Sequence, residues 1–242
     1  MDQTYGCSQV LDIAEEPRHH LVLANEFVRA FAVEIPPHDR TLCHRHPQDY
    51  LLYSASDAEI ISAVRDEEPK RLSYRDGECE LLSAGLVHVV DNIGDNPVRN
   101  VVVELLPRAS ELRRGRKPRN VDTVGIRYDG ISSTSIFEDE RAAIFLVKIK
   151  PGGEAGISGP AIVATPYGNK LTPDAISDVE VKNHPSCDLA WILPSGTWVL
   201  WGRWKQTERV IVFQIGRTDE QGLAVSDVRN PLRSLRAHAE PE

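Results

Sequence analysis

The sequence is a succession of short apolar runs separated by turn-forming residues. Most runs are rich in Val, Ile and aromatic residues, and turn signals such as Asp76-Gly77 and Pro151-Gly152-Gly153 lie between them. Runs of this length and spacing are typical of an antiparallel sandwich or barrel rather than of βαβ units. We therefore predict an all-β protein with strands at 27–35, 50–53, 59–64, 87–90, 98–106, 142–150, 161–165, 189–193, 198–201 and 210–215.

Composition narrows the classes of partner. The 242 residues are 41% hydrophobic and 26% charged, which is typical of a globular protein with well-developed cores. The net charge of -8 argues against broad binding to nucleic acid or to anionic membranes. No apolar run approaches the roughly 18–20 residues that a membrane-spanning helix needs. We expect a small-molecule substrate or ligand, and a chain that is a monomer or a homodimer.

The cysteines and the N-terminus predict the compartment. The first residues lack a basic start followed by an apolar stretch, so we expect no secretory signal. Cys7, Cys43, Cys79 and Cys187 include no CxxC pair. The sequence therefore predicts four reduced thiols in a cytoplasmic protein. A contact between Cys43 and Cys79 is the alternative that this reasoning leaves open.

The two halves of the chain are similar to each other. Residues 29–37 (RAFAVEIPP) parallel residues 143–151 (AIFLVKIKP) at an offset of 114, and residues 101–105 parallel residues 211–215 at an offset of 110. This indicates a duplication with small loop deletions. We predict a first barrel at 1–108, a basic linker at 109–122, a second barrel at 123–224 and a tail at 225–242. The basic stretch 108–120 is interpreted as a solvated linker or, alternatively, as an anion- or partner-binding patch.

Three histidines carry the main chemical signal. His44 and His46 form an H-x-H pair, and residues two apart on a strand face the same side. His88 follows a turn at the start of another predicted strand. Three imidazoles from neighbouring strands can occupy three positions around a divalent metal ion and leave others open. The ion would be Fe, Mn, Ni, Cu or Zn, because imidazole suits these metals.

The spacing around His88 resembles the second motif of the cupin family, G-x5-P-x-G-x2-H-x3-N. Gly77, Gly85, His88 and Asn92 are all in register, and Ser83 replaces the proline. This resemblance implies a double-stranded β-helix, or jelly-roll, barrel. Together with the duplication it implies a bicupin, in which one chain contains two cupin-type barrels.

The first cupin motif, G-x5-H-x-H-x3,4-E-x6-G, is matched only in part. His44 and His46 are present, but His38 replaces the leading glycine and Tyr50 stands where the family usually has its ligand glutamate. The resemblance implies three histidine ligands without the carboxylate, as in some cupin dioxygenases. Such a site is one charge unit more positive than a site with three histidines and one glutamate, which favours anionic substrates or bound hydroxide.

The position of Tyr50 admits more than one interpretation. Its ring either fills the core or lines the cavity and donates a hydrogen bond there. Gln48 and Asp49 are the neighbouring candidates for a fourth ligand.

The second half does not repeat the histidines. By the offset of 114, the positions of His44 and His46 correspond to Ser158 and Pro160. By an offset of 111, at which residues 83–85 parallel residues 194–196, the positions of His88 and Asn92 correspond to Val199 and Arg203. We therefore predict a degenerate, metal-free second barrel. All four tryptophans lie in this half, and we expect them to fill the core, to form an interface or to line an aromatic pocket: Trp191, Trp198, Trp201 and Trp204. The remaining histidines show no ligand pattern and are predicted to be exposed: His19, His20, His38, His184 and His238.

These observations predict a metal-dependent enzyme of the dioxygenase type that acts on a small organic molecule. His44, His46 and His88 would hold the metal, and Tyr50 or Gln48 would orient the substrate. Two other functions remain open at this stage. One is a noncatalytic module that binds a small ligand or regulates, and the other is an isomerase or lyase that uses the metal only to polarise a carbonyl.

Overall fold

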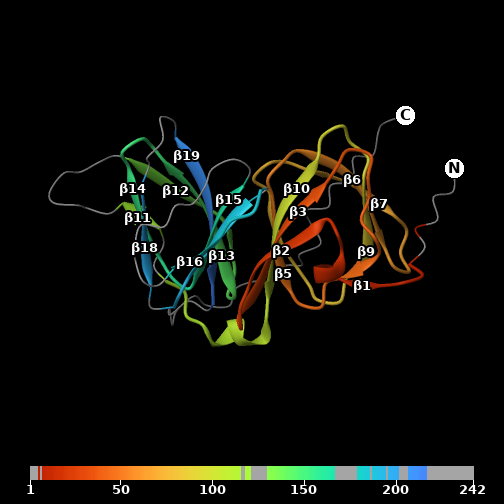
Figure 1. Cartoon of the computed structure of the whole chain (residues 1–242), viewed down its shortest axis with the longest axis horizontal. Helices are drawn as coiled ribbons and strands as arrows, with labels where there is room; N and C mark the ends of the chain where they lie inside the picture. The colour runs from red at the N-terminus through yellow and green to blue at the C-terminus, as the bar shows by residue number, and fades with distance from the viewer. Residues whose placement is uncertain are drawn as a thin grey trace, which may run out of the picture.

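Two β-sandwiches make up the protein and lie side by side (Figure 1). The computed structural model describes residue 5 and residues 7–115, 118–120, 130–166, 179–185, 187–194, 196–201 and 207–216. Within these residues the helices are two short 3-10 turns, η1 (Ile13–Glu15) and η2 (Pro107–Glu111). Neither of these helices has the length that a membrane crossing requires. The predicted all-β class is confirmed.

The first half consists of two five-stranded sheets. One has the order β1 (Leu11–Asp12), β4 (His44–Arg45), β9 (Val87–Asn92), β6 (Ala58–Val64), β7 (Lys70–Tyr74). The other has the order β2 (His19–Ala24), β3 (Val28–Ile35), β10 (Val98–Leu105), β5 (Tyr50–Ser54), β8 (Cys79–Leu82). The two sheets face each other across a shared interior.

The second half repeats this plan. A three-stranded sheet has the order β11 (Arg119–Asn120), β14 (Glu154–Ser158), β18 (Thr197–Trp201). A six-stranded sheet has the order β12 (Ile131–Glu138), β13 (Ala142–Ile149), β19 (Glu208–Ile215), β15 (Ala161–Pro166), β17 (Cys187–Ile192), β16 (Val179–Lys182). One sheet in each half therefore contains a central antiparallel pair of eight-residue strands, β3 with β10 and β13 with β19.

Strand register supports the duplication. In the first half β3 pairs antiparallel with β10, and Val28 lies opposite Leu105. In the second half β13 pairs antiparallel with β19, and Ala142 lies opposite Ile215. The pairs are related by the sequence offsets of 114 and 110 residues, so the same central ladder occurs twice.

Alternate side chains along β3 belong to two different cores. Phe31 and Val33 belong to the cluster inside the first barrel. Ala30 and Ala32 point the other way, into a larger cluster that includes residues of both halves, such as Trp191. Successive side chains on a strand face opposite sides, so one strand supplies the barrel interior and the contact between halves at once.

Polar contacts add to this apolar interface. Arg209 of the second half donates to Asp76 and to the hydroxyl of Tyr53 in the first half. Arg141 of the second half forms an ion pair with Asp49. The ring of Phe27 stacks on Trp191 with centroids 6.1 Å apart, and these contacts join the two barrels.

The start of the basic segment is packed rather than wholly solvated. Ala109 and Leu112 are buried in the cluster that joins the two halves. Arg114 lies 3.7 Å from the carboxylate of Glu138. Residues 116–117 and 121–129 lie outside the described part of the chain, as does the predicted tail 225–242. The domain boundaries themselves stay a prediction.

The prediction of four reduced thiols is wrong. Cys7 and Cys43 form a disulfide, while Cys79 and Cys187 are free. The alternative contact between Cys43 and Cys79 is wrong for the same reason. Strand β1 runs parallel to β4, with Leu11 opposite His44, and this pairing brings the preceding segment to Cys43. The expected cytoplasmic location loses the support of reduced thiols and stays a prediction.

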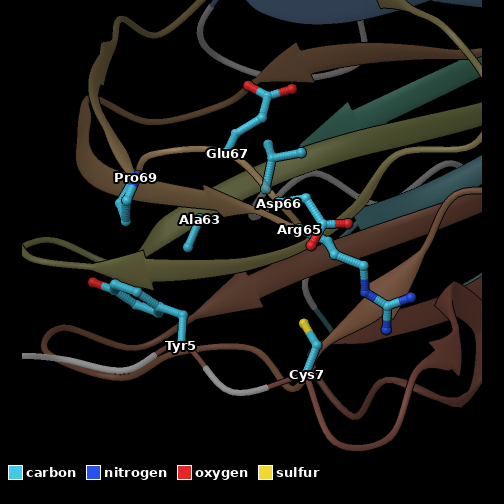
Figure 2. Close-up of a pocket in the computed structure, with 8 residues that line it drawn as sticks. Tyr5, Cys7, Ala63, Arg65, Asp66, Glu67 and Pro69 are labelled. Carbon is cyan, nitrogen blue, oxygen red and sulfur yellow. The ribbon is translucent and has the colours of Figure 1, made fainter.

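The disulfide lies on the outer face of the sheet that contains β4, β9 and β6. A surface cavity of about 480 Å³ adjoins it. Figure 2 shows Tyr5 and Cys7 on one side of this cavity and the segment from Ala63 to Pro69 on the other. The hydroxyl of Tyr5 donates to Asp91 over 3.3 Å. The N-terminal segment therefore covers the back of the sheet whose inner face bears the histidines.

Apolar side chains form most of the described interior of the second barrel, and Asp188 and Gln214 are buried with them. Trp198 is 1% exposed and lies opposite Ile157 in the β14–β18 pair, the counterpart of the β4–β9 pair. Trp198 therefore fills the core and Trp191 lies in the interface, two of the expected locations. The side chains of Trp201, Trp204 and Val199 lie outside the described residues. The metal-free character of this barrel stays a prediction.

Candidate metal site

The loops on both sides of His88 are built from the residues of the second motif. Gly77 and Gly85 have φ of 98° and 92°, the left-handed region that glycine adopts without a steric penalty. The amide of Asn92 donates to the carbonyls of Ile35, Pro36 and Asn96, so it closes the neighbouring loop. These residues thus fix the two ends of β9, the strand that carries His88.

The three predicted ligands converge inside the first barrel. His44 and His88 are direct cross-strand partners in the β4–β9 pair. Nε2 of His88 lies 3.1 Å from Nε2 of His44 and 3.3 Å from Nε2 of His46. Nitrogens bound to one ion at about 2.1 Å would lie about 3.0 Å apart at a right angle and about 3.4 Å apart at the tetrahedral angle. The spacing therefore fits a shared ion.

Hydrogen bonds on the far side of the rings orient two of these histidines. Nδ1 of His44 donates to the carbonyl oxygen of Leu42 over 2.9 Å. Because a carbonyl oxygen only accepts, this bond leaves Nε2 of His44 with a lone pair directed at the cluster. Nδ1 of His88 lies 3.4 Å from the hydroxyl of Ser62. Nδ1 of His46 is buried and has no hydrogen-bond partner among the described residues.

Burial keeps the cluster neutral. It lowers the pKa of His44 to about 4, with the neighbouring His19 adding to the effect. Burial also lowers the pKa of His46 and of His88 below the ordinary imidazole value, and His44 contributes to both shifts. Neutral imidazoles are the form that binds a metal. Lone pairs brought this close repel one another unless a proton or a cation lies between them, which again fits an ion.

A fourth histidine, predicted to be exposed, joins this cluster. His19, on β2, is only 7% exposed, and its ring centroid lies 4.6 Å from that of His44. Potential ligand atoms of His19, His44 and His46 lie within 4.8 Å of one another. The prediction for His19 is therefore wrong, because pairing of β2 with β3 turns alternate residues inward. The sequence signal that could have found it is the carboxylate of Glu16, three residues earlier.

Glu16 is fully enclosed by hydrogen-bond donors. Its Oε2 accepts from Nδ1 of His19 over 2.7 Å and from the backbone of Arg18 over 2.8 Å. Its Oε1 accepts from the backbone of Leu42 over 3.1 Å and from the guanidinium of Arg18 over 3.3 Å. Burial alone would raise the pKa of Glu16, but the hydrogen bonds from His19, Leu42 and Arg18 outweigh it and lower the pKa to about 2.

The other histidines lie away from this site. His20 is exposed and stacks on half-buried His184 of the second half, with centroids 4.9 Å apart. His38 is exposed and lies 3.2 Å from the carboxylate of Asp95. Its φ of 57° is the left-handed conformation, which explains a glycine at this position of the cupin motif. His238 lies outside the described residues.

Tyr50 lies against the cluster. It is 1% exposed, and its ring stacks on His46 with centroids 4.0 Å apart and planes at 18°. Burial raises the pKa of Tyr50, so its hydroxyl stays protonated and is available as a hydrogen-bond donor. Both interpretations of this residue, as core aromatic and as part of the site, therefore apply to one ring.

Tyr50 belongs to a polar row across the inner face of the barrel. Its cross-strand partner on β10 is Glu104, and the partner of Glu104 on β3 is Arg29. Nε of Arg29 donates to Oε2 of Glu104 over 2.7 Å. The other carboxylate oxygen, Oε1, is buried and has no hydrogen-bond partner among the described residues.

Gln48 and Asp49 are not brought to the histidines. Both line a cavity of about 360 Å³ between the two halves, together with Arg141 and Ser110. Asp49 accepts a hydrogen bond from the backbone of Ala84 over 2.7 Å and pairs with Arg141. Asp49 therefore contributes to the contact between the two halves. The residues that the structure brings together in the first barrel are His44, His46, His88, His19 and Tyr50.

The set of donors restricts the metal. Four imidazoles offer only nitrogen, whereas Mg²⁺ and Ca²⁺ need oxygen ligands. A divalent ion of the Fe, Ni, Cu or Zn type fits the residues present, and Mn fits less well.

Comparisons with known proteins agree with the topology. A structure of AerE from Microcystis aeruginosa aligns over 83% of this chain and 98% of its own, at 15% identity and a TM-score of 0.50. A salicylate 1,2-dioxygenase from Pseudaminobacter salicylatoxidans aligns over 80% of this chain and 75% of its own, at 12% identity and a TM-score of 0.47. A cupin domain from Bordetella pertussis Tohama I aligns over 36% of this chain and 90% of its own, at 22% identity and a TM-score of 0.35.

The fold is thus an all-β one with two cupin-type barrels, and AerE shares it over most of both chains. At these identities the likeness concerns the fold alone. No protein-family model matches this chain, and no curated protein matches it in sequence. Its chemistry therefore has to be argued from the residues in its first barrel.

Proposed function

We propose that the protein is a mononuclear metal enzyme that catalyses a dioxygenase-type reaction on a small organic molecule. The observation that supports it is the convergence of three Nε2 atoms, separated by 3.1 and 3.3 Å for the two measured pairs, in a buried and neutral cluster. His44, His46 and His88 would hold the ion, with His19 as a fourth nitrogen ligand. A bound ion of this kind supplies Lewis acidity and a template on which substrate and dioxygen meet.

The chain's own residues would define the substrate. No carboxylate lies among the candidate ligands, so the ion keeps its full positive charge and favours an anionic group. Tyr50, stacked on His46, presents a protonated hydroxyl that would donate to an oxygen of the substrate. The free Oε1 of Glu104, one strand away, would accept from a hydroxyl or amine. A small hydroxylated or aminated carboxylic acid satisfies all three requirements. Gln48 has no part in this proposal because it lines a different cavity.

Metal analysis and oxygen uptake test the proposal. The purified chain is loaded with Fe²⁺ under argon, then mixed with aerobic buffer and a panel of small hydroxy acids and amino acids in an oxygen-electrode cell. We expect stoichiometric metal binding and substrate-dependent oxygen consumption, both lost in His46→Ala. His20→Ala is the matched control, because His20 is exposed and its ring lies outside the cluster.

Each other outcome identifies a different function. Product formation under argon, with no oxygen consumed, would replace the dioxygenase with an isomerase or lyase. A chain that binds none of Fe²⁺, Mn²⁺, Ni²⁺, Cu²⁺ or Zn²⁺ and gains no thermal stability from them would overturn the enzyme proposal in favour of a ligand-binding module.

A further inference from the structure

The buried carboxylate of Glu16 is linked by hydrogen bonds to two candidate ligands, to His19 directly and to His44 through Leu42. Glu16 is 1% exposed and lies just after η1, whose N-terminus is capped by Asp12. Its two oxygens accept four hydrogen bonds, which is the full capacity of an ionised carboxylate. A group that satisfies every lone pair in this way is held in one orientation and constrains what it touches.

The first route from Glu16 to the site is direct. Nδ1 of His19 lies 2.7 Å from Oε2 of Glu16, and the backbone amide of His19 also donates to the carbonyl oxygen of Glu16 over 3.0 Å. Because the carboxylate only accepts, Nδ1 of His19 is the donor in this bond, which leaves Nε2 as the ring nitrogen that could bind an ion. A carboxylate behind a histidine fixes the ring and raises the basicity of its other nitrogen.

The second route runs through one peptide residue. The backbone N–H of Leu42 donates to Oε1 of Glu16 over 3.1 Å. The carbonyl oxygen of the same Leu42 accepts from Nδ1 of His44 over 2.9 Å. Glu16 therefore holds the segment that fixes the tautomer and the ring orientation of His44.

The guanidinium of Arg18 anchors this arrangement from outside. It donates to Oε1 of Glu16 over 3.3 Å and to both oxygens of Asp39 over 2.8 Å. Asp39 lies in the loop that leads from β3 toward β4, and its carbonyl oxygen accepts from the backbone of Asn92 over 2.9 Å. Through Arg18 and Asp39 the carboxylate is thereby also linked to β9, the strand that carries His88.

We propose that Glu16 is the positioning residue of the metal site, which sets the tautomer and orientation of His19 directly and of His44 through Leu42. This inference rests on the proposed metal function and deepens it. The family's ligand carboxylate is missing at Tyr50, and Glu16 instead places a negative charge behind the ligands. The site thus keeps an all-nitrogen set of ligands while the carboxylate holds the ring of His19 in place.

Metal titration of the whole chain tests this role. Wild type, Glu16→Gln, His19→Ala and the double variant are titrated with Co²⁺, and the visible d–d absorption and the dissociation constant are measured for each. Glu15→Gln is the matched control, because Glu15 is the adjacent glutamate and is exposed. Far-UV circular dichroism of the metal-free proteins establishes that each variant is folded.

We expect Glu16→Gln to weaken Co²⁺ binding by about 10- to 100-fold, the range seen when an outer-shell partner of a ligand is lost. Its d–d spectrum should change toward that of His19→Ala, and its effect should be smaller in the His19→Ala background than in wild type. Glu15→Gln should match wild type. Equal effects of Glu16→Gln in both backgrounds, or an unchanged spectrum, would overturn the inference.

A measurement on wild type covers the case in which Glu16→Gln does not fold. Proton NMR of the Co²⁺-loaded chain in water displays the ring N–H protons of the ligands at hyperfine-shifted positions. We expect slowly exchanging N–H signals from His19 and His44, assigned by their loss in His19→Ala and His44→Ala. Fast exchange of the His19 signal would contradict the bond to Glu16. A wild type that binds no Co²⁺ would instead count against the metal site itself.

Discussion

At the scale of single residues, the interior of the first barrel contains a cluster of buried imidazoles. Contacts with Leu42 and Ser62 occupy the far nitrogens of His44 and His88, and the Nε2 atoms are left facing one another. Burying a polar group costs free energy unless a partner satisfies it. An ion that binds all three rings at once provides that partner, so metal binding and stability should be coupled.

The coupling predicts the effect of removing one ligand. His88→Ala should lower the metal content of the purified protein by about tenfold or more, because one of three convergent nitrogens is lost. The fold should persist, since the variant leaves the strand pairing of β9 in place. Elemental analysis of the protein measures the effect, and His38→Ala, an exposed histidine, is the control. Unchanged occupancy in His88→Ala would remove this residue from the site.

The buried carboxyl group of Glu104 should make the stability of the protein depend on pH. Burial raises its pKa, and the neighbouring Arg29 offsets only part of that effect. A carboxyl whose folded pKa lies above its unfolded value contributes stability at low pH and loses it as the pH rises through the folded value. Gln resembles the protonated form, so Glu104→Gln should gain stability relative to wild type between about pH 4 and about pH 7.

Urea unfolding at several pH values measures this difference. Glu67→Gln, at an exposed position, should show a difference from wild type that does not change over the same range. A Glu104→Gln variant that instead loses stability relative to wild type as the pH rises would show that the carboxylate form is the favoured one.

At the scale of elements, the short strand β4 depends on its neighbours. It consists of only two residues and pairs with β9 on one side and with β1 on the other. The disulfide joins Cys43, the residue before His44, to the N-terminal segment that covers the outer face of the same sheet. The disulfide thus reinforces the short strand that carries His44 and is followed directly by His46.

Removing the disulfide should lower stability. Cys7 and Cys43 are 36 residues apart, and closing a loop of this length restricts the unfolded chain by roughly 3–4 kcal/mol in the loop-entropy model. We expect Cys7→Ser to reduce the free energy of unfolding by about this amount in denaturant titrations. Adding a reductant should bring wild type to the level of the variant and should leave the variant unchanged. Equal stability of oxidised and reduced wild type would contradict this.

At the scale of the whole molecule, the two barrels share one apolar cluster. Residues of β3, β5 and β10 in the first half and of β13, β15, β17 and β19 in the second half belong to it. An interface that resembles a domain core makes independent movement of the halves unfavourable. The chain should therefore unfold as one cooperative unit.

Two tryptophans allow the interface and the core of the second barrel to be tested separately. Trp191 lies in the shared cluster, while Trp198 lies in the interior of the second barrel. Replacing either with Ala should cost roughly 3–5 kcal/mol. Trp191→Ala should also split the calorimetric transition in two, because it weakens the contact between halves. Trp198→Ala should destabilise the second barrel more than the contact. A single unchanged transition in Trp191→Ala would argue against a shared core.

Much of the fold followed from local patterns. Predicted strands such as 50–53 and 210–215 correspond to β5 and β19. Runs of β-branched and aromatic residues bounded by turn residues favour strands over other secondary structure. Strand β7, with the sequence KRLSY, was missed because a half-exposed edge strand carries no apolar run. The convergence of His44, His46 and His88 was predicted because the spacing of these residues resembles that of the cupin motifs.

The sequence by itself determined the all-β class, the duplication and the three histidines, since each depends on order along one chain. Only the tertiary structure decided that His19 and Glu16 belong to the site and that Cys7 meets Cys43. It also decided that Asp49 serves the contact between halves. These outcomes depend on which strands become neighbours, and the pairing of β1 with β4 and of β2 with β3 is set by the packing of the entire barrel.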